Sequence, residues 1–295
     1  MIQTKHKAFS PGRIGAIASN TLLELVRLKV FYFLLIFALV IIGSSAFMVR
    51  FTFQEQFQVL KDVSLGAMSI FTWLLSVLAT AMLLPKEIED RTLYTILAKP
   101  VPRLEYLLGK LLGVFLLLLI STLVMSALFV VVLYAREQMV LADTIREYAG
   151  APQAQIDAAI RGVKATTFTA SLVPGIVTIY LKATLFAALT MLISTFASSM
   201  IFTIMISVAI YFIGHIEGVA RDYVLASGGA SQLGRALLWV IVIVFPDLQL
   251  FNLVDDIVAG NAIALGLFLK TAGLGVTYTC VYTLAAYFMF AGKEL

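Results

Sequence analysis

The stretch KEIEDRTLYTILAKPVPRLEYLLGK, from Lys86 to Lys110, is the most densely charged part of this sequence, and the fold is organised around it. Nine of its 25 residues are charged. The runs on either side, Val63–Pro85 and Leu111–Tyr134, are apolar and carry no charge. Because uncharged runs of about 20 residues are typical of membrane spans, the stretch is predicted to be a water-facing link between two spans, where a partner can bind.

The composition indicates a multi-span membrane protein. Hydrophobic residues make up 61% of the chain, charged residues 13%, and the mean hydropathy is +1.00, against roughly 45–50% and 25% in soluble domains. Its 295 residues have room for about six spans and no large soluble domain, so we expect one transmembrane domain over 1–295. The net charge of +4 is typical of basic loops at a cytoplasmic face and does not favour nucleic-acid binding.

The expected fold is all-α with six transmembrane helices. The spans are predicted at about 30–49, 63–85, 106–134, 172–196, 200–214 and 262–290. Residues 1–29 form a tail and a basic amphipathic helix that lies on the inner membrane surface or extends the first span. Residues 50–62 form a polar loop. The outer segment 135–171 forms two short surface helices separated by Gly150-Ala151-Pro152, and 215–261 is an outer segment whose apolar run 236–245 is too short to span and is re-entrant or interfacial.

The distribution of Lys and Arg predicts the orientation. With the N-terminus inside, the inner segments hold 11 basic residues in 61 positions, and the outer segments hold 8 in 97. This bias favours both termini in the cytoplasm and places the segment 86–105 there.

The cytoplasmic segment combines charge with an apolar cluster. Glu87 and Arg91 are four residues apart and can pair along a helix. Beyond them, Leu93, Tyr94, Ile96 and Leu97 have nothing obvious in the chain to cover them, and Pro100 and Pro102 end the helix. Such a cluster indicates a helix that enters a groove of another protein, although it could instead lie on lipid headgroups.

These residues resemble the permease subunits of type-2 ATP-binding-cassette (ABC) transporters. The similarity is carried by Glu87-Ile-Glu-Asp-Arg-Thr-Leu, Lys99-Pro-Val-Pro-Arg and Tyr106-Leu-Leu-Gly-Lys110, and extends more weakly along nearly the whole chain. It implies a cytoplasmic coupling helix, from Glu87 to Leu97, that sits in a groove of a separate ATPase subunit. The coupling residues would be Glu87, Glu89, Asp90, Arg91, Leu93, Tyr94, Ile96 and Leu97.

The resemblance also implies an exporter in a bacterial cytoplasmic (inner) membrane, with membrane lipids around it. Two permease copies, or this chain and a paralogue, would pair with two ATPase subunits. The sequence has no G-x-x-x-x-G-K-[ST], and Leu108-Gly109-Lys110 lacks the upstream glycine and the Ser or Thr. We therefore expect ATP and Mg²⁺ to bind the partner ATPase, and this chain to bind no cofactor and to be no enzyme by itself. The outer segment 135–171 is longer than expected for a minimal member.

Lys182 is the charge predicted to lie deepest in a span, about ten residues beyond Leu172. Ionisable residues inside a membrane are costly and often functional, so Lys182 could line a substrate path. It could also reach the outer interface or pair with Glu217 or Asp247. His215 and Glu217 are expected to form an interfacial polar cap, because the second histidine, His6, is predicted on the opposite side and a metal site needs more ligands.

Two other function classes compete with the permease. An ion-coupled secondary carrier could use Lys182 as its coupling residue, although the two halves show no convincing internal repeat. An intramembrane lipid-modifying enzyme is a more remote alternative, because the sequence has no Gly-x-Ser-x-Gly, His-Glu-x-x-His or paired intramembrane aspartates. The substrate stays open in every case.

Overall fold

The computed structural model of the protein describes residues 10–47, 53–83, 102–197, 199–227 and 247–292. Helix makes up 88% of the structure, and no strand occurs in these ranges. The predicted all-α class is therefore confirmed for the part of the chain described. In chain order the elements are α1 (Pro11–Val26), α2 (Lys29–Ser44), η1 (Ser45–Phe47), α3 (Phe53–Ala81), α6 (Arg103–Glu147), α7 (Gln153–Thr167), α8 (Leu172–Phe196), α9 (Met200–Ser227), η2 (Leu248–Phe251), α11 (Val254–Val258) and α12 (Leu265–Ala291).

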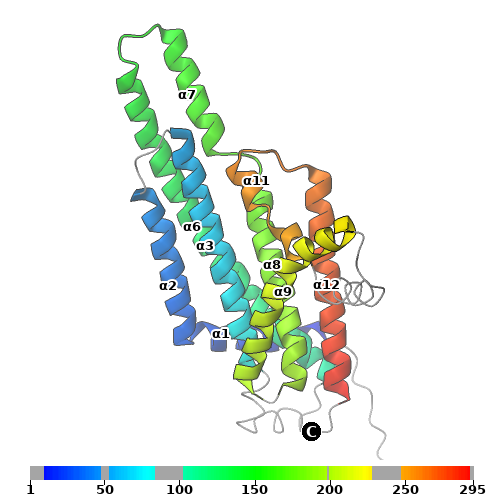
Figure 1. Ribbon diagram of the computed structural model, residues 1–295. Helices are drawn as coiled ribbons and strands as arrows, with labels where there is room; N and C mark the ends of the chain where they lie inside the picture. The colour runs from blue at the N-terminus through cyan, green and yellow to red at the C-terminus, as the bar shows by residue number, and fades with distance from the viewer. Residues whose placement is uncertain (1–9, 48–52, 84–101, 198, 228–246, 293–295) are drawn as a thin grey trace, which may run out of the picture.

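The long helices pack around α8, which contacts α12, α3, α6 and α9 (Figure 1). Four consecutive residues of α8, from Leu185 to Ala188, are all completely buried. At 3.6 residues per turn, four successive side chains point in directions about 100° apart and so sample the whole circumference of the helix. Helix α8 is therefore covered on every side. A helix that is apolar all round is stable only in such a central position. The core of the bundle is therefore built on α8.

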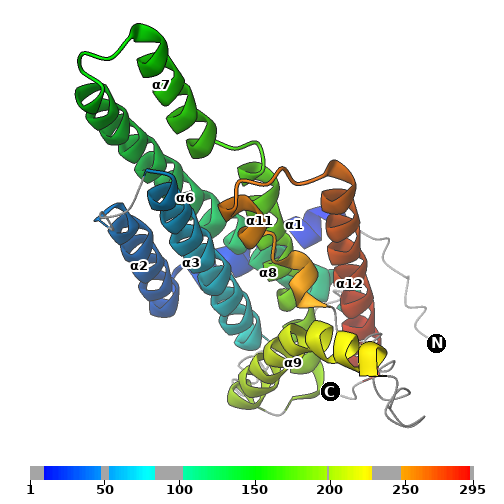
Figure 2. The same cartoon turned by 45° about the horizontal axis from the view of Figure 1, so that its top comes forward.

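Helix α1 runs crosswise at one end of the bundle, where Figures 1 and 2 show it behind the upright helices. Its buried residues Ile14, Ala18, Thr21 and Leu25 form one stripe at helical spacing and face α6. Leu23, on another face, is exposed. The predicted surface helix is thus confirmed as a helix, and its position against lipid stays a prediction.

Five helical ranges are long and apolar enough to cross a membrane. The predicted span 200–214 falls in α9. The apolar part of α9, Met200–His215, is shorter than these five ranges. The six-span count therefore stays a prediction. The five ranges are Lys29–Phe47, Glu55–Ala81, Arg103–Glu147, Gln153–Phe196 and Leu265–Ala291.

Two boundaries were predicted wrongly. Helix α3 already begins at Phe53, so residues 53–62 are not a loop. Helix α6 continues to Glu147, so the first of the two predicted surface helices is an extension of the third span. No proline or glycine interrupts either extension, and Arg136 of α6 donates to Gln56 Oε1 of α3 at 2.8 Å, which holds the two extensions together.

The remaining outer elements follow the prediction more closely. The break between α6 and α7 is confirmed and contains Gly150 at φ +103°, a conformation that suits glycine. Helix α8 has the predicted bounds of the fourth span, and α12 covers most of the last one. The apolar run 236–245 lies outside the described residues.

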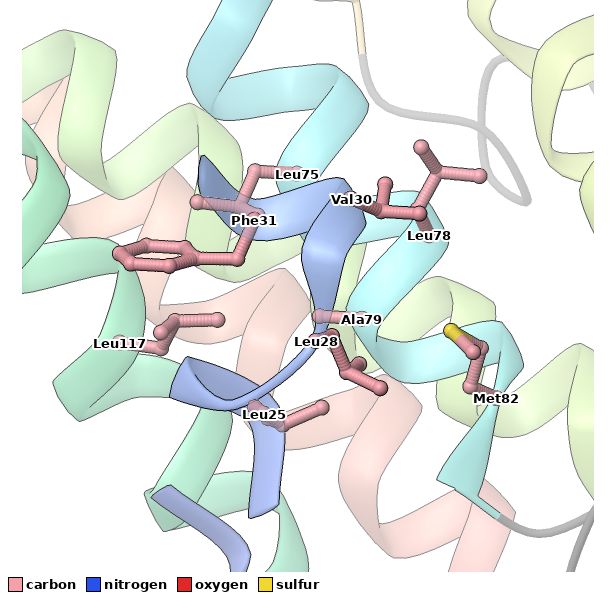
Figure 3. A pocket seen from close by; sticks show the side chains of 9 residues that line it. All are labelled: Leu25, Leu28, Val30, Phe31, Leu75, Leu78, Ala79, Met82 and Leu117. Atoms are coloured by element: carbon pink, nitrogen blue, oxygen red, sulfur yellow. The ribbon is translucent and has the colours of Figure 1, made fainter. Parts of the chain in front are cut away.

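A bend at Leu28 separates α1 from α2 and is enclosed by α3 and α6. Figure 3 shows the side chains from the four helices around it. They leave a cavity of about 10 Å³, which is no larger than one water needs. All nine lining residues are apolar, so the cavity is a packing gap at the bend and offers a ligand neither space nor hydrogen bonds: Leu25, Leu28, Val30, Phe31, Leu75, Leu78, Ala79, Met82 and Leu117.

Candidate functional site

The eight predicted coupling residues, from Glu87 to Leu97, lie outside the described residues. The structure describes the chain on both sides of them, up to Leu83 and again from Pro102. Leu78 and Met82, near the end of α3, line the gap that also contains Leu25 of α1. The start of α6 packs on α1 as well. Both flanks of the predicted coupling segment therefore meet at the α1 end of the bundle (Figure 1).

A buried carboxylate joins α1 to the first turn of α6. Glu105 is 1% exposed, and its Oε1 accepts hydrogen bonds from Ser10 N at 3.0 Å and Arg13 Nη2 at 2.7 Å. Its Oε2 accepts from Arg13 Nε. A two-pronged arginine–carboxylate contact fixes both distance and orientation. The hydrogen bond to Glu105 also raises the pKa of Arg13, so this pair keeps its charge.

A second ionic contact holds α1 further along α6. Lys110 Nζ lies 3.5 Å from Glu24 Oε2 and 5.9 Å from the ring centre of Tyr106. The lysine side chain is almost fully covered, whereas that of Glu24 is 43% exposed. Solvent reaches the contact from one side, so it contributes less than a fully buried pair.

Between these contacts, Gly109 and Gly113 let the two helices approach closely. A Cβ at Gly109 would lie 2.7 Å from the Ile17 Cβ, and one at Gly113 would lie 2.7 Å from the Thr21 Cβ and 2.9 Å from the Ala18 carbonyl oxygen. Helices in membranes use two glycines four residues apart for such contacts. The sequence signal, Gly-x-x-x-Gly, was present but was not used in the prediction.

The first turn of α6, which contains Glu105, also holds the end of α12. Arg103 Nη1 donates to the carbonyl oxygens of Phe290, at 3.2 Å, and Ala291, at 2.6 Å. A cation there satisfies terminal carbonyls and complements the helix dipole. The Tyr106 ring stacks on Phe290 with 6.1 Å between centroids. We call residues 103–113 of α6 the α6 hub, because they join α1 and α12 shortly after the last predicted coupling residue, Leu97.

Lys182 is buried between α8 and α9. It is 5% exposed, and its Nζ lies 3.5 Å from His215 Nε2 and 5.3 Å from the centre of the Tyr211 ring. Because an ammonium group can only donate, Nε2 must be the acceptor, and His215 Nδ1 donates to Tyr211 O at 3.0 Å. This arrangement requires a neutral histidine. Among the described residues, Lys182 forms no ion pair.

The predicted partners of Lys182 are only partly described. The side chain of Glu217 lies outside the described part. Asp247 accepts a hydrogen bond from Gln249 N at 3.0 Å, and the Gln249 side chain donates to His215 O at 3.1 Å. His215 therefore contacts Lys182 directly, instead of only capping the helix at the interface as predicted.

An aromatic cluster lies on the Tyr211 side of this lysine. Tyr211 packs on Trp73 of α3, with 3.9 Å between ring centroids, and on Phe186 of α8 at 5.6 Å. The Trp73 Nε1 is buried and has no hydrogen-bond partner in the structure. The cluster thus presents one cation and one unsatisfied N–H within an apolar core, donors that could recognise an anionic or carbonyl-bearing group. Among the described residues, no group of three or more His, Cys, Asp or Glu could hold a metal ion.

Part of the chain matches a known protein family. Residues 22–147 match the family described as ABC-2 family transporter protein. The matched range begins in α1, ends with α6, and contains the predicted coupling segment and the α6 hub. A comparison with curated proteins found no match.

Proposed function

We propose that the chain is the permease subunit of an ABC exporter, on the premise that its residues 22–147 match the family described as ABC-2 family transporter protein. Five helices with the length and composition of membrane spans support a multi-pass membrane protein. In this proposal the segment 86–105 couples the permease to a separate ATPase subunit that binds ATP and Mg²⁺. The complex lies in the cytoplasmic membrane of a bacterium and contains two permease chains.

We propose six crossings with both ends of the chain in the cytoplasm. Ser10 bonds to Glu105, and Ala291 bonds to Arg103, so both described ends of the chain meet the first turn of α6. An odd number of crossings would separate them. The five candidate spans therefore need a sixth, and α9 supplies it in this proposal.

The observation that carries the coupling proposal is the position of the α6 hub. It follows the predicted coupling segment directly and is bonded to α1 through Glu105 and to α12 through Arg103. A displacement of the segment by an ATPase would move these three helices together, because packed helices transmit shifts as rigid elements. In this mechanism, ATP binding closes the ATPase subunits and opens a path at the interface of the two permeases.

The test is co-purification of the tagged chain from its native membrane in mild detergent. We expect a P-loop ATPase to co-purify with the wild type and to be lost with Leu93→Asp/Leu97→Asp. Placing charge in an apolar contact should cost a few kcal/mol. The control is Met139→Asp/Ile145→Asp, which adds the same charges to exposed positions on the outer part of α6. Retention of the ATPase by a correctly inserted Leu93→Asp/Leu97→Asp variant would contradict the coupling role.

The Lys182–His215 contact supports an ion-coupled carrier as the second candidate. A lysine and a neutral histidine 3.5 Å apart in an apolar core could exchange a proton during transport. The two candidates differ in their energy source. Transport that stops on dissipating the proton gradient while ATP is maintained, by a chain that purifies without an ATPase, would favour the carrier.

A further inference from the structure

A polar cavity lies in the half of the bundle opposite α1. It has a volume of about 230 Å³ and is lined by α3, the end of α7, and the end of α11 with the residues after it. A single water needs only about 10–15 Å³ by such a measure, so this space is large enough for a chemical group of several atoms. Its polar side chains come from Gln58 and Lys61 of α3 and from Thr166 and Thr169.

Lys61 supplies a buried positive charge to this cavity. The residue is 2% exposed, and its Nζ donates to Thr166 O at 2.7 Å. An ammonium group has three protons, and a carbonyl oxygen offers it no negative charge. Lys61 forms no ion pair within the described part of the chain. Buried charges are normally paired, so Lys61 still requires a counter-charge.

The Thr169 hydroxyl is a second, independent sign that a ligand is missing from this cavity. Its Oγ1 is buried and has no hydrogen-bond partner in the structure, although the residue lines the cavity. Buried polar groups without a partner are rare and call for an explanation such as an unseen water or ion. The hydroxyl and the ammonium group therefore both need a partner in the same space.

The lining selects for negative charge. It offers an ammonium, an amide and two hydroxyl groups, and contains no carboxylate. The acidic side chains of α11 do not line the cavity, and both have other partners: exposed Asp255 accepts from Asn252, and half-buried Asp256 accepts from Asn261. Ser171 fixes the wall by accepting from Ile263 N at 3.2 Å and donating to Asn261 O at 2.9 Å. These contacts hold the cavity in shape without filling it.

The depth of Lys61 suits a group at the membrane boundary. Gln56 bonds to Arg136, which follows the uncharged run of α6. Lys61 is five residues further into α3, or about 7.5 Å at 1.5 Å per residue. The cavity is therefore close to where the polar outer part of the protein meets its apolar part.

We infer that this cavity binds a phosphate-type oxyanion, held by the Lys61 ammonium group with hydrogen bonds from Thr169 and Gln58. The oxyanion is either the headgroup of a phospholipid or a free phosphate-bearing solute. The inference does not rest on the proposed ATPase partnership, because the cavity and the α6 hub are in opposite halves of the bundle. Loss of the ATPase would leave this site intact.

The experiment uses the purified full chain and the variants Lys61→Met, Thr169→Val and Lys164→Met. Lys164 is an exposed lysine of α7, so its variant is the matched control for loss of charge. Native mass spectrometry after mild delipidation counts retained phosphatidylglycerol. Thermal unfolding with inorganic phosphate, against chloride at equal ionic strength, detects the free ion.

A lipid headgroup predicts one tightly retained phosphatidylglycerol in the wild type and in Lys164→Met, at least tenfold less in Lys61→Met, and a smaller loss in Thr169→Val. A free oxyanion predicts a saturable rise in Tm with phosphate that Lys61→Met abolishes. If Lys61→Met does not fold, the test uses Thr169→Val, which should reduce lipid retention or the phosphate-dependent rise in Tm. Equal lipid retention and equal phosphate response in the wild type and the cavity variants would overturn the inference and leave a cavity that holds only water.

Discussion

The two halves of the bundle differ in whether their buried charges have ionic partners. At the α1 end, Glu105 is enclosed by Arg13 and the Ser10 N–H, and helices α1 and α6 touch at Gly109 and Gly113. In the other half, Lys61 lies beside a cavity of about 230 Å³. Lys182 of α8 lies against His215 and the Tyr211 ring. At the α1 end, the buried charges hold helices together. Lys61 and Lys182 have no carboxylate partner among the described residues, so their charges are available to a ligand.

Among the variants below, Gly113→Ala should lower the Tm most. In Gly113→Ala the new Cβ would meet the Ala18 carbonyl oxygen at 2.9 Å, and the backbone of α1 cannot move away cheaply. Overpacking of this kind costs about 1–3 kcal/mol, so we expect a clear fall in Tm in detergent. Gly66→Ala is the control, because nothing lies within 4 Å of its new Cβ. Equal Tm values for the two variants would show that α1 is not held tightly against α6.

Removing the charge of Glu105 should have the next largest effect. Glu105→Gln leaves Arg13 without its carboxylate, and we expect a lower Tm than for Glu147→Gln, which changes an exposed glutamate of the same helix. Arg13 is about one-third exposed, so solvent reduces the loss.

The double variant tests whether the two side chains act as one contact. Adding Arg13→Gln to Glu105→Gln should lower the Tm little further, because both changes remove the same interaction. Fully additive effects in the thermal unfolding series would contradict the pairing.

Lys182→Met should affect stability least, and in the opposite direction. A buried charge without a counter-charge is costly, so its replacement by an apolar side chain should leave the Tm unchanged or raise it slightly, while transport is impaired. Ala183→Val, the neighbouring buried position, is the control for a packing effect alone. A fall in Tm as large as that of Glu105→Gln would mean that Lys182 is a structural partner in the native state, and the contrast between the two halves would fail.

Hydropathy was sufficient to predict most of the apolar helices, because membrane spans must satisfy their backbone groups internally. It placed α8 from Leu172 to Phe196, as observed. It failed where helices continue into water. The polar residues 53–62 suggested a loop, and 135–147 suggested a separate surface helix. No helix breaker interrupts either stretch, and α3 and α6 support one another through Gln56 and Arg136.

The site was harder to predict because its contacts join residues far apart in the sequence. Glu105 meets Arg13 across 92 positions, and Lys61 meets Thr166 across 105. Lys61 stood in a predicted loop, where a lysine is unremarkable, and only the packing of α7 and α11 buries it. Lys182 was identified from its depth alone, but its contact with His215 depends on how α8 and α9 align, which periodicity does not determine. The coupling residues stay a prediction from sequence.

The most direct test of the coupling role is photo-crosslinking from position 94 in the native membrane. A photoreactive phenylalanine replaces Tyr94 in one variant and the exposed Ile145 in another, and the adducts are identified by mass spectrometry. If Glu87–Leu97 is the coupling helix, position 94 crosslinks to a P-loop ATPase, with a yield that changes when ATP is added, and position 145 does not. Adducts with lipid alone at position 94 would place this helix on the headgroups and rule out the coupling role.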